Sequence, residues 1–393
     1  MSIHVAYLAA GRLHLKRGNE PVRVIESKFG QNIRERALQI QRRNAWKTEG
    51  RGAQFQSGGL LWGMPERDPA EMRIAITSVS RGRNAGELLY SLDTDDIGGM
   101  FAVKDWGAEE QRIFHSSERR VRDLCTAPGQ EQIACSVVSE FGTGHIGVRP
   151  IDGSQITEIT EGDSLDLCPR WVPGAKNQIV FQSAGVGRDP NGVVLGHGPF
   201  AVHKLDVETG QMTSLAEDEG HDLLAPQIDH AGNLWFIRRP YALAQRPSPW
   251  RTLKDVLLIP FRVLHTLFQW INFRSIAYTG QPLNSTGDAR EQRMDIKRMM
   301  IWGNLIDAER AMRDGRRDGS KAPALVPKTW ELVRHAPDGK EETIARSVIS
   351  FDLCEDGSLI FSNGSAIYHR QPTGQSEELL VDRYIEQVIA VGS

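Results

Sequence analysis

The feature that most constrains this chain is a unit of short apolar runs, separated by Gly, Asp and Pro, that recurs along its length. The clearest copy begins at Leu165, where a Pro-Gly turn at Pro173-Gly174 precedes the apolar run Gln178–Phe181. A Gly-rich loop follows, and then two more runs joined by a turn at Gly210. Four short strands punctuated by turn residues are the signature of a propeller blade.

The turn between the last two strands measures the period, because a tight hairpin there needs Gly at positive φ. From Gly339 to Gly374 is 35 residues, and running from Gly374 past the C-terminus and on from Met1 to Gly18 takes 37. This near-equality indicates that the N-terminal segment supplies three strands of a blade and the C-terminal segment the fourth. Turns of this kind are expected around Gly18, Gly153, Gly210, Gly339 and Gly374.

We therefore predict an all-β fold, a six-bladed propeller closed by N- and C-terminal strands in one shared blade, which removes exposed sheet edges. Seven blades are the alternative, because the segment from 52 to 118 is poorly resolved into strands. The predicted domains are propeller blades at 1–239 with a helical insert at 28–50, a helical hairpin insertion at 240–327, and the remaining blades with the ring closure at 328–393. The later units are expected to begin near Arg120, Ser164, Asp222 and Ser347.

The Leu165 unit resembles the TolB-like, or WD-repeat-like, β-propeller family. The match lies in Pro169-Arg170-Trp171-Val172-Pro173-Gly174 followed by Ile179-Val180-Phe181, and the turn at Leu205–Gly210 looks like that family's "DLxTG". The other blades lack the Trp. The resemblance implies a fold and not an activity.

Function in a propeller usually resides in the loops that interrupt the blades. Loops joining strand two to strand three, and blade to blade, emerge on one face, and the long elements here are expected on that face. The other face is expected to carry only short turns, which read "LAAG", "APGQ", "PGAK", "HAGN" and "EDG". The decorated face is therefore the predicted working surface.

Two of the long elements are basic. Residues 241–327 carry six more positive than negative charges and residues 28–51 five more, although the whole chain has a net charge of −3. Such appendages could bind an acidic partner or lie back on their own propeller. Candidate partner-binding residues are Val256, Phe261, Val263, Leu267, Trp270, Ile271, Arg188, His197, Arg42 and Arg43.

The insertion is predicted to form two helices. Leu253–Phe273 is amphipathic at helical spacing, and its polar Arg262, His265 and Gln269 argue against a membrane span. A second helix is expected at roughly Ala289–Arg313. The pair would pack on the propeller or dock on a partner.

The four cysteines are predicted to be free thiols, because they are few, widely spaced and lack a CxxC motif. The three "DLC" sequences place Cys125, Cys168 and Cys354 at different offsets from their turns, so no symmetric metal site is expected. No cofactor is predicted. The first residues show no secretory signal, which favours a cytoplasmic, bacterial protein.

The leading functional prediction is a non-enzymatic interaction platform in a cytoplasmic multiprotein assembly, with an unidentified protein partner on the decorated face. The alternative is a propeller hydrolase or lyase that uses the same face, with His145 and His197 as the histidines that could converge there. Peripheral membrane or nucleic-acid contact through the basic insertions is a less favoured alternative. An enzyme needs a concave pocket with clustered ionisable groups, whereas a platform needs exposed apolar or basic surface.

Overall fold

The computed structural model divides the chain into two compact units, Met1–Pro240 with Asp307–Ser393, and Tyr241–Ile306. Within the second unit the structure shows a hairpin of β19 (Met299–Ile301) and β20 (Asn304–Ile306). The residues that the structure describes are 3–48, 72, 74–84, 86–94, 97–107, 109–126, 131–139, 142–151, 155–241, 299–301, 304–306, 312–313 and 321–391.

The first unit consists of β-sheets in which most neighbouring strands are consecutive and antiparallel. One four-stranded sheet has the order β27-β1-β2-β3, with bounds Ile385–Val391, His4–Ala9, Arg12–Arg17 and Arg23–Ile25. The next is β4-β5-β6-β7, with bounds Ile74–Arg81, Leu88–Thr94, Gly98–Lys104 and Glu109–Ser116. A short 3₁₀ turn at Asp105–Gly107 joins β6 to β7.

A nine-stranded sheet contains two four-stranded groups, because β10 and β12 meet in parallel at Gly144 and Leu165. Its first group is β8 (Arg120–Cys125), β9 (Gln132–Val138), β10 (Gly144–Pro150) and β11 (Thr157–Glu158). Its second group is β12 (Ser164–Trp171), β13 (Gln178–Arg188), β15 (Ala201–Asp206) and β16 (Met212–Ala216), and β14 (Val194–His197) pairs with the far end of β13.

Two more four-stranded sheets complete the unit. The first is β17 (His221–Ile228), β18 (Leu234–Pro240), β21 (Glu331–His335) and β22 (Glu341–Arg346). The second is β23 (Ser350–Leu353), β24 (Leu359–Ser362), β25 (Ala366–Arg370) and β26 (Ser376–Val381).

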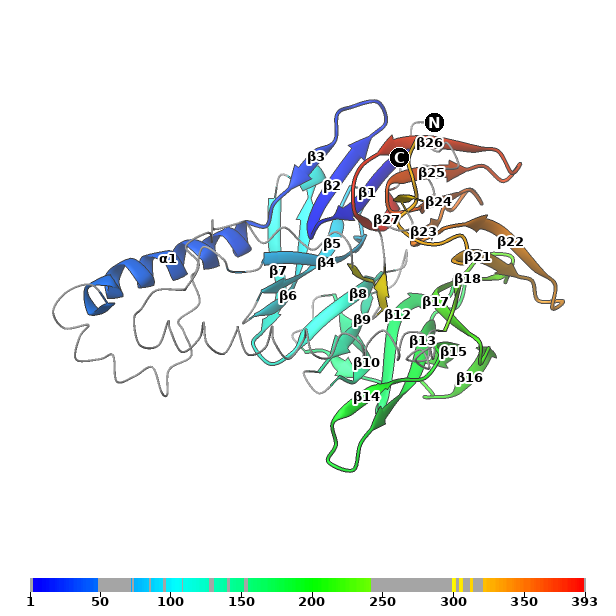
Figure 1. The fold of residues 1–393 in the computed structure, drawn as a ribbon, viewed down its shortest axis with the longest axis horizontal. Helices are drawn as coiled ribbons and strands as arrows, with labels where there is room; N and C mark the ends of the chain where they lie inside the picture. The colour runs from blue at the N-terminus through cyan, green and yellow to red at the C-terminus, as the bar shows by residue number, and fades with distance from the viewer. Residues whose placement is uncertain are drawn as a thin grey trace, which may run out of the picture. The chain divides into compact units, whose positions relative to one another are not determined.

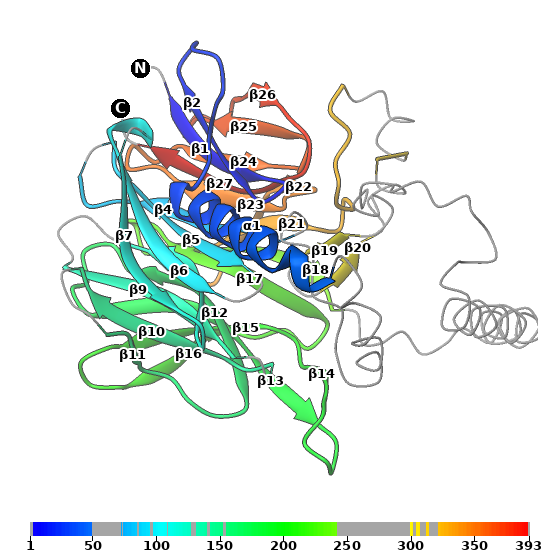
Figure 2. The same ribbon diagram turned by 90° about the vertical axis from the view of Figure 1, so that its left-hand side faces the viewer.

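The first and last strands of the chain lie side by side, as the blue β1 and red β27 show in Figure 1. They pair in antiparallel register, with Ala6 opposite Ile389 and a bulge between Leu8 and Ala9. Figure 2 shows the same arrangement from another side. The strand pairing predicted between the two ends of the chain is therefore present.

We call six strands the inner strands: β4, β8, β12, β17, β23 and β27. Each is the first strand of its group in spatial order, and consecutive inner strands contact or hydrogen-bond one another. Four groups begin within three residues of the positions expected from sequence, at Arg120, Ser164, His221 and Ser350. Four of the five predicted Gly turns are confirmed, since Gly18, Gly210, Gly339 and Gly374 all have positive φ. The fifth, Gly153, lies outside the described residues.

Three of the inner strands carry a β-bulge with a non-glycine residue at positive φ, which the sequence pattern does not reveal. Asp123, Cys168 and Ala225 sit at positive φ where the pairing register shifts. This backbone conformation is unfavourable for non-glycine residues and frees a ladder N–H. At two bulges the preceding four-stranded group accepts that N–H: Cys168 donates to Ser136 Oγ at 3.1 Å and Ala225 to Gln182 Oε1 at 2.7 Å.

The hydrophobic core consists of clusters between adjacent sheets. The residues Leu8, Val79 and Tyr90 pack in one cluster that joins the β27-β1-β2-β3 sheet to the β4–β7 sheet. Another cluster joins β8–β10 to β12–β15 through Ile146, Trp171 and Phe181. Each large apolar side chain buried in this way stabilises the fold by about 1.5–3 kcal/mol relative to exposure.

The helix α1 (Lys28–Thr48) follows β3, where a helical insert was predicted. Its N-terminus is held by Glu110 of β7, whose carboxylate accepts the backbone N–H groups of Lys28 and Phe29, each at 2.9 Å. Ser27 caps the same turn by accepting the N–H of Gly30 at 3.2 Å. A carboxylate at a helix N-terminus is stabilised by the unpaired N–H groups and the helix dipole.

Two expectations need correction. The helix predicted at Ala289–Arg313 is wrong at Met299–Ile306, where the structure has strands β19 and β20. Gly303 in the sequence between them is unfavourable in a helix. The "LAAG" turn joins β1 to β2, the second and third strands of their sheet, so it belongs to the end of the sheets that carries the long loops.

The helix predicted at Leu253–Phe273 lies outside the described residues. The end of the predicted insertion packs on the sheet β23–β26, where Leu325 donates its N–H to Asn363 and Asn363 Nδ2 donates to the carbonyl of Ala322. None of the helices among the described residues is long and apolar enough to cross a membrane.

Candidate functional site

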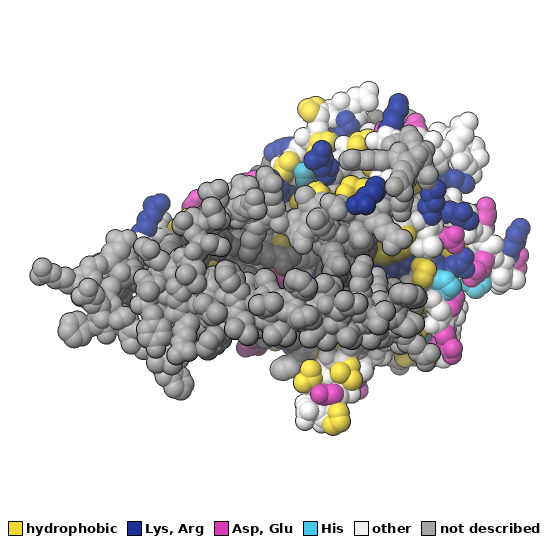
Figure 3. All heavy atoms as spheres, in the orientation of Figure 1, with side chains coloured by type: hydrophobic (Ala, Val, Ile, Leu, Met, Phe, Trp, Pro, Cys, Tyr) yellow, Lys and Arg dark blue, Asp and Glu magenta, His cyan; other side chains and the backbone are white. Residues whose placement is uncertain are grey.

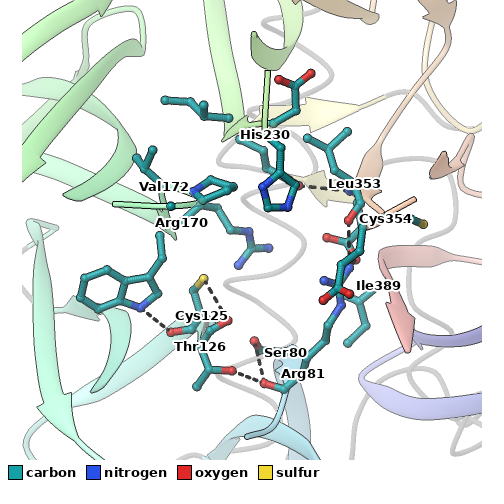
Figure 4. Close-up of a pocket in the computed structure, with 18 of the residues that line it drawn as sticks. Ser80, Arg81, Cys125, Thr126, Arg170, Val172, His230, Leu353, Cys354 and Ile389 are labelled. Carbon is teal, nitrogen blue, oxygen red and sulfur yellow. Dashed lines mark hydrogen bonds and ion pairs between the residues drawn. The ribbon is translucent and has the colours of Figure 1, made fainter. Parts of the chain in front are cut away.

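A cavity of about 770 Å³ lies where the C-terminal ends of the inner strands meet. Its lining comes from all six inner strands and from the turns that follow four of them (Figure 4). The lining residues are Val79, Ser80, Arg81, Cys125, Thr126, Arg170, Trp171, Val172, Pro173, Gly174, Ala175, Lys176, Gln227, Ile228, Asp229, His230, Asp352, Leu353, Cys354, Glu355 and Ile389.

Arg81 and Asp352 form an ion pair across one side of the cavity, with 2.5 Å between Arg81 Nη2 and Asp352 Oδ2. Arg81 also donates to the carbonyls of Ala390 and Leu353, at 2.6 and 3.0 Å. Asp352 Oδ2 in turn accepts the N–H of Ala390 at 2.8 Å. The charge of Asp352 raises the pKa of Arg81. The hydrogen bonds of the pair link β23, β27 and β4.

Arg170 has a different environment. Its side chain is half-buried, and in Figure 4 its guanidinium points into the middle of the cavity. Nη1 donates to the carbonyl of Leu124 at 3.1 Å, and no carboxylate of the described residues lies within ion-pair distance. Burial alone would lower the pKa of Arg170, but the nearby acidic groups, Cys125 and Asp352 among them, outweigh it and raise the pKa.

The rim of the cavity carries exposed Lys176, His230 and Glu355. Asp229 is occupied within its own turn, where it accepts hydrogen bonds from Asn233 and Trp235. The walls are mostly apolar and include Val79, Val172, Pro173, Ile228, Leu353 and Ile389.

Two thiols also line the cavity, Cys125 and the half-buried Cys354. Burial raises the pKa of Cys354 to about 11, so this thiol is protonated near neutral pH and is a poor nucleophile. All four cysteines are free, as predicted. Cys125 lies in a strand, Cys168 in a bulge and Cys354 after a strand end, so the three "DLC" cysteines occupy different positions.

The arrangement is suited to binding an anion. One guanidinium faces an apolar space, and a buried cation is stabilised by a paired and hydrogen-bonded anion. The described residues contain no group of three or more His, Cys, Asp or Glu side chains placed to hold a metal ion.

The predicted partner-binding residues lie elsewhere. Arg188 and His197 belong to the β13–β14 hairpin. This hairpin continues from the C-terminal end of the second strand of its group, so it projects from the end of the sheets that lies opposite the cavity. Arg42 and Arg43 are exposed on α1. The remaining six, Val256, Phe261, Val263, Leu267, Trp270 and Ile271, lie outside the described residues.

The tip of the β13–β14 hairpin is apolar and exposed. The side chains of Val193, Val194 and Leu195 are 61%, 39% and 74% exposed. Figure 3 shows yellow side chains on this projection at its lower edge. These three consecutive residues form a small exposed apolar patch at the tip of the hairpin.

The two histidines considered for catalysis are not brought together by any contact among the described residues. His197 donates from Nδ1 to the carbonyl of Gly198 at 2.8 Å and packs against Phe200. His145 lies on β10, with a buried Nδ1 that has no hydrogen-bond partner within the described part of the chain.

Sequence reasoning missed the cavity because the bulges shift the inner strands out of alignment. After four inner strands, one residue donates its backbone N–H across the turn that follows. The residue two positions before that donor is polar in each strand: Ser80, Arg170, Gln227 and Asp352. This recurrence is the sequence signal that indicates the cavity.

No protein-family model matches this sequence, and no curated protein sequence matches it either. Solved structures do match by fold. TolB from Acinetobacter baumannii is 9% identical with a TM-score of 0.51, over 99% of this chain and 66% of the TolB chain, just under two thirds of its length.

Two other matches have TM-scores below 0.5. A chain of the nidogen/laminin complex is 7% identical with a TM-score of 0.49, over 99% of this chain and 98% of that one. A puromycin-hydrolyzing peptidase of Mycobacterium tuberculosis is 11% identical with a TM-score of 0.46, over 99% of this chain and 48% of the peptidase. Together with the sheet order described above, the TolB match shows that this chain has a TolB-like β-propeller fold.

Proposed function

We propose that this protein is a non-enzymatic, cytoplasmic β-propeller platform that binds a protein partner through the end of the sheets that carries α1 and the β13–β14 hairpin. The observation that carries the proposal is the exposed apolar tip Val193–Leu195. Large apolar side chains in water gain about 1.5–3 kcal/mol each when a partner buries them fully.

The hairpin presents this tip in an ordered conformation. Arg188 forms an ion pair with Asp163 at 2.8 Å and donates to the carbonyl of Gly192 at 3.0 Å. Asp189 Oδ1 accepts the N–H groups of Asn191 and Val193, which fixes the turn. An ordered loop loses less conformational entropy on binding, which favours affinity.

The helix α1 offers a second contact on the same end of the sheets. Ile40 is 58% exposed there, and Arg42 and Arg43 are exposed beside it. Apolar and basic side chains together fit a partner surface with apolar and acidic groups.

We also interpret the propeller as six-bladed and closed. Hydrogen bonds between neighbouring four-stranded groups support this, since each consecutive pair of groups is linked. The bonds are Thr126 to the carbonyl of Arg81, Trp171 to that of Cys125, Ala225 to Gln182, Gln227 to the carbonyl of Phe351, Val388 to Ser350, and Val79 to Gln387. Mass spectrometry of limited-proteolysis fragments tests closure, because a closed ring resists cleavage between its blades.

The partner proposal is tested by capture with purified protein. The double substitution Val193→Asp with Leu195→Asp should lose a partner that the wild-type protein recovers from its native host. The matched control is Met212→Asp, an exposed apolar residue on β16 that is 58% exposed. All three proteins should have the same unfolding midpoint, because these side chains contribute little to the core.

The affinity for the recovered partner, measured with both components purified, then gives the decisive comparison. A tenfold or larger loss in the double variant only, about 1.4 kcal/mol or more, supports the proposal. Equal affinity in all three proteins contradicts it and places the contact elsewhere.

A further inference from the structure

The cavity has the size of a small-molecule site. Ligand pockets usually measure about 300–1,000 Å³, and this one is about 770 Å³. It lies at the opposite end of the sheets from α1 and the β13–β14 hairpin, because the residues that line it end the inner strands and form the turns to the second strands. A ligand here would therefore be independent of the partner surface proposed above.

The charges of the cavity are unequally compensated. Arg81 is paired with Asp352, and Asp229 is held by donors in its own turn. Lys176 and Glu355 are exposed at the rim, one of each sign. Arg170 remains in the interior without an ion-pair partner among the described residues.

The guanidinium of Arg170 has donors to spare. An Arg side chain carries five N–H donors, and in the described structure one nitrogen, Nη1, donates to Leu124. A planar guanidinium with unused N–H groups matches a carboxylate, which accepts two parallel hydrogen bonds from it. The Arg170 charge has no ion-pair partner among the described residues, and it matches one negative charge.

Neighbouring groups favour a monocarboxylate over a phosphate. Asp352 is close enough to Arg170 to raise its pKa, and it would repel a dianion more strongly than a monoanion. The walls formed by Val79, Val172, Ile228, Leu353 and Ile389 offer no further cations and suit an apolar body. Burial of such a body adds about 25 cal/mol for each Å² removed from water.

We propose that this cavity binds a monocarboxylate with an apolar body, with the carboxylate on Arg170 and the body against the apolar walls. The same chemistry is found in a free aliphatic acid and at the C-terminus of a peptide that ends in an apolar residue. Arg170 is the specificity-determining residue of the site, and Ile228 shapes its apolar wall.

The test measures binding to the full-length protein by calorimetry. The probes are hexanoate, 1-hexanol, hexyl phosphate, and a short peptide ending in leucine as the free acid and as the amide. We expect hexanoate or the free-acid peptide to bind, and to bind more tightly than the neutral probe of matched length and than hexyl phosphate. Binding by hexanoate alone indicates a free acid as the ligand, and binding by the free-acid peptide alone indicates a chain end.

The variants assign the binding to the cavity. Arg170→Gln should weaken carboxylate binding by about tenfold or more, whereas Arg170→Lys should retain part of it because the charge remains. Arg383→Gln, on an exposed arginine outside the cavity, should bind as the wild type does. Ile228→Trp should reduce binding by filling the space, and it keeps the test valid if Arg170→Gln does not fold.

Alkylation of Cys354 gives a second readout, because this thiol lines the same cavity. The bound carboxylate should slow its modification by iodoacetamide in the wild-type protein and not in Arg170→Gln. The proposal is overturned if neither carboxylate probe binds, if hexyl phosphate binds more tightly than both, or if Arg170→Gln and Ile228→Trp bind as the wild type does.

Discussion

At the scale of single residues, the surroundings decide what each arginine does. Arg239 is fully buried, with its Nε 2.8 Å from Asp222 Oδ2 and its guanidinium over the ring of Trp330. Arg334 makes a pair of similar length with Glu342, but both side chains are about half exposed. Arg170 faces a cavity. Arginine therefore has three roles in this protein: a buried ion-pair partner at Arg239, a solvated surface group at Arg334 and a candidate ligand-binding group at Arg170.

The contrast between the two pairs predicts different costs of truncation. Asp222→Ala leaves the Arg239 guanidinium buried without its carboxylate and removes the acceptor of the Phe200 N–H. We expect a loss of about 3–5 kcal/mol in the free energy of unfolding. Glu342→Ala should cost about 0–1 kcal/mol, because water screens and replaces that exposed partner. Urea titration of both variants measures the difference, and equal losses would contradict this reading of the buried pair.

The turn between β17 and β18 predicts a dependence on pH. Burial works against the charge of Asp229, but hydrogen bonds from Asn233, Trp235 and Ala231 outweigh it and lower the pKa of this carboxyl below its usual value of 3.8. A carboxyl whose pKa is lowered by folding stabilises the protein above its unfolded pKa. That contribution is lost as the pH falls through about 4 toward the folded pKa.

Asp229→Asn removes the titrating group and should cost about 1–3 kcal/mol near neutral pH, because at least one of the donors loses its acceptor. The difference in stability between the two proteins should narrow as the pH falls below about 4. Unfolding midpoints measured across this range give the comparison. A difference that is constant or grows on acidification would show that the charge of Asp229 is not the stabilising feature.

At the scale of secondary-structure elements, α1 depends on a contact at its first turn. Glu110 accepts two backbone N–H groups of the helix and the hydroxyl of Tyr90 at 2.7 Å. Burial is the main cause that raises the pKa of Tyr90, and the hydrogen bond to Glu110 adds to it, so the hydroxyl remains a donor. One strand of the β4–β7 sheet thus fixes where the helix begins.

Glu110→Ala should therefore destabilise the attachment of α1. Loss of a carboxylate that caps a helix and accepts a buried hydroxyl costs about 1–3 kcal/mol. The neighbouring Glu109→Ala is the matched control, because Glu109 is exposed. Hydrogen exchange of the first-turn amides should accelerate in Glu110→Ala and not in Glu109→Ala. Unchanged exchange in both variants would show that the helix is held by other contacts.

The elements also show how far sequence patterns reach. Strand starts at Arg120 and Ser164 and the turns at Gly210 and Gly339 follow the prediction, because alternation and Gly conformations are local properties. The bulges at Cys168 and Ala225 depend on acceptors from a neighbouring four-stranded group, which no local pattern encodes. The residues around the Arg170 cavity come together only when those bulges are taken into account, so the sequence pattern does not predict the cavity. It does predict short turns, but it assigns no function to the face that carries them.

At the scale of the whole molecule, β27 links the two ends of the chain. Its residues Ile385, Val388 and Ile389 are buried in clusters with the first and last sheets. Asp352 and Gln387 join it to β23 and β4. The strand therefore contacts β1, β4 and β23.

Deletion of residues 385–391 should lower the unfolding midpoint sharply, because it exposes the edge of β1 and two apolar clusters. The control removes only the last two residues of the sequence and should leave the midpoint unchanged. Differential scanning calorimetry compares the three proteins. A truncated protein that melts like the intact one would rule out a structural role for this strand.

The pairing of Ala6 with Ile389 also has a consequence for synthesis. A ribosome adds about 5–20 residues per second, so β1 waits roughly 20–75 s before its partner strand exists. During that interval the buried face of β1, including Val5, Tyr7 and Ala9, has no β27 to cover it. The nascent chain should therefore be a substrate for ribosome-associated chaperones until the last strand leaves the exit tunnel.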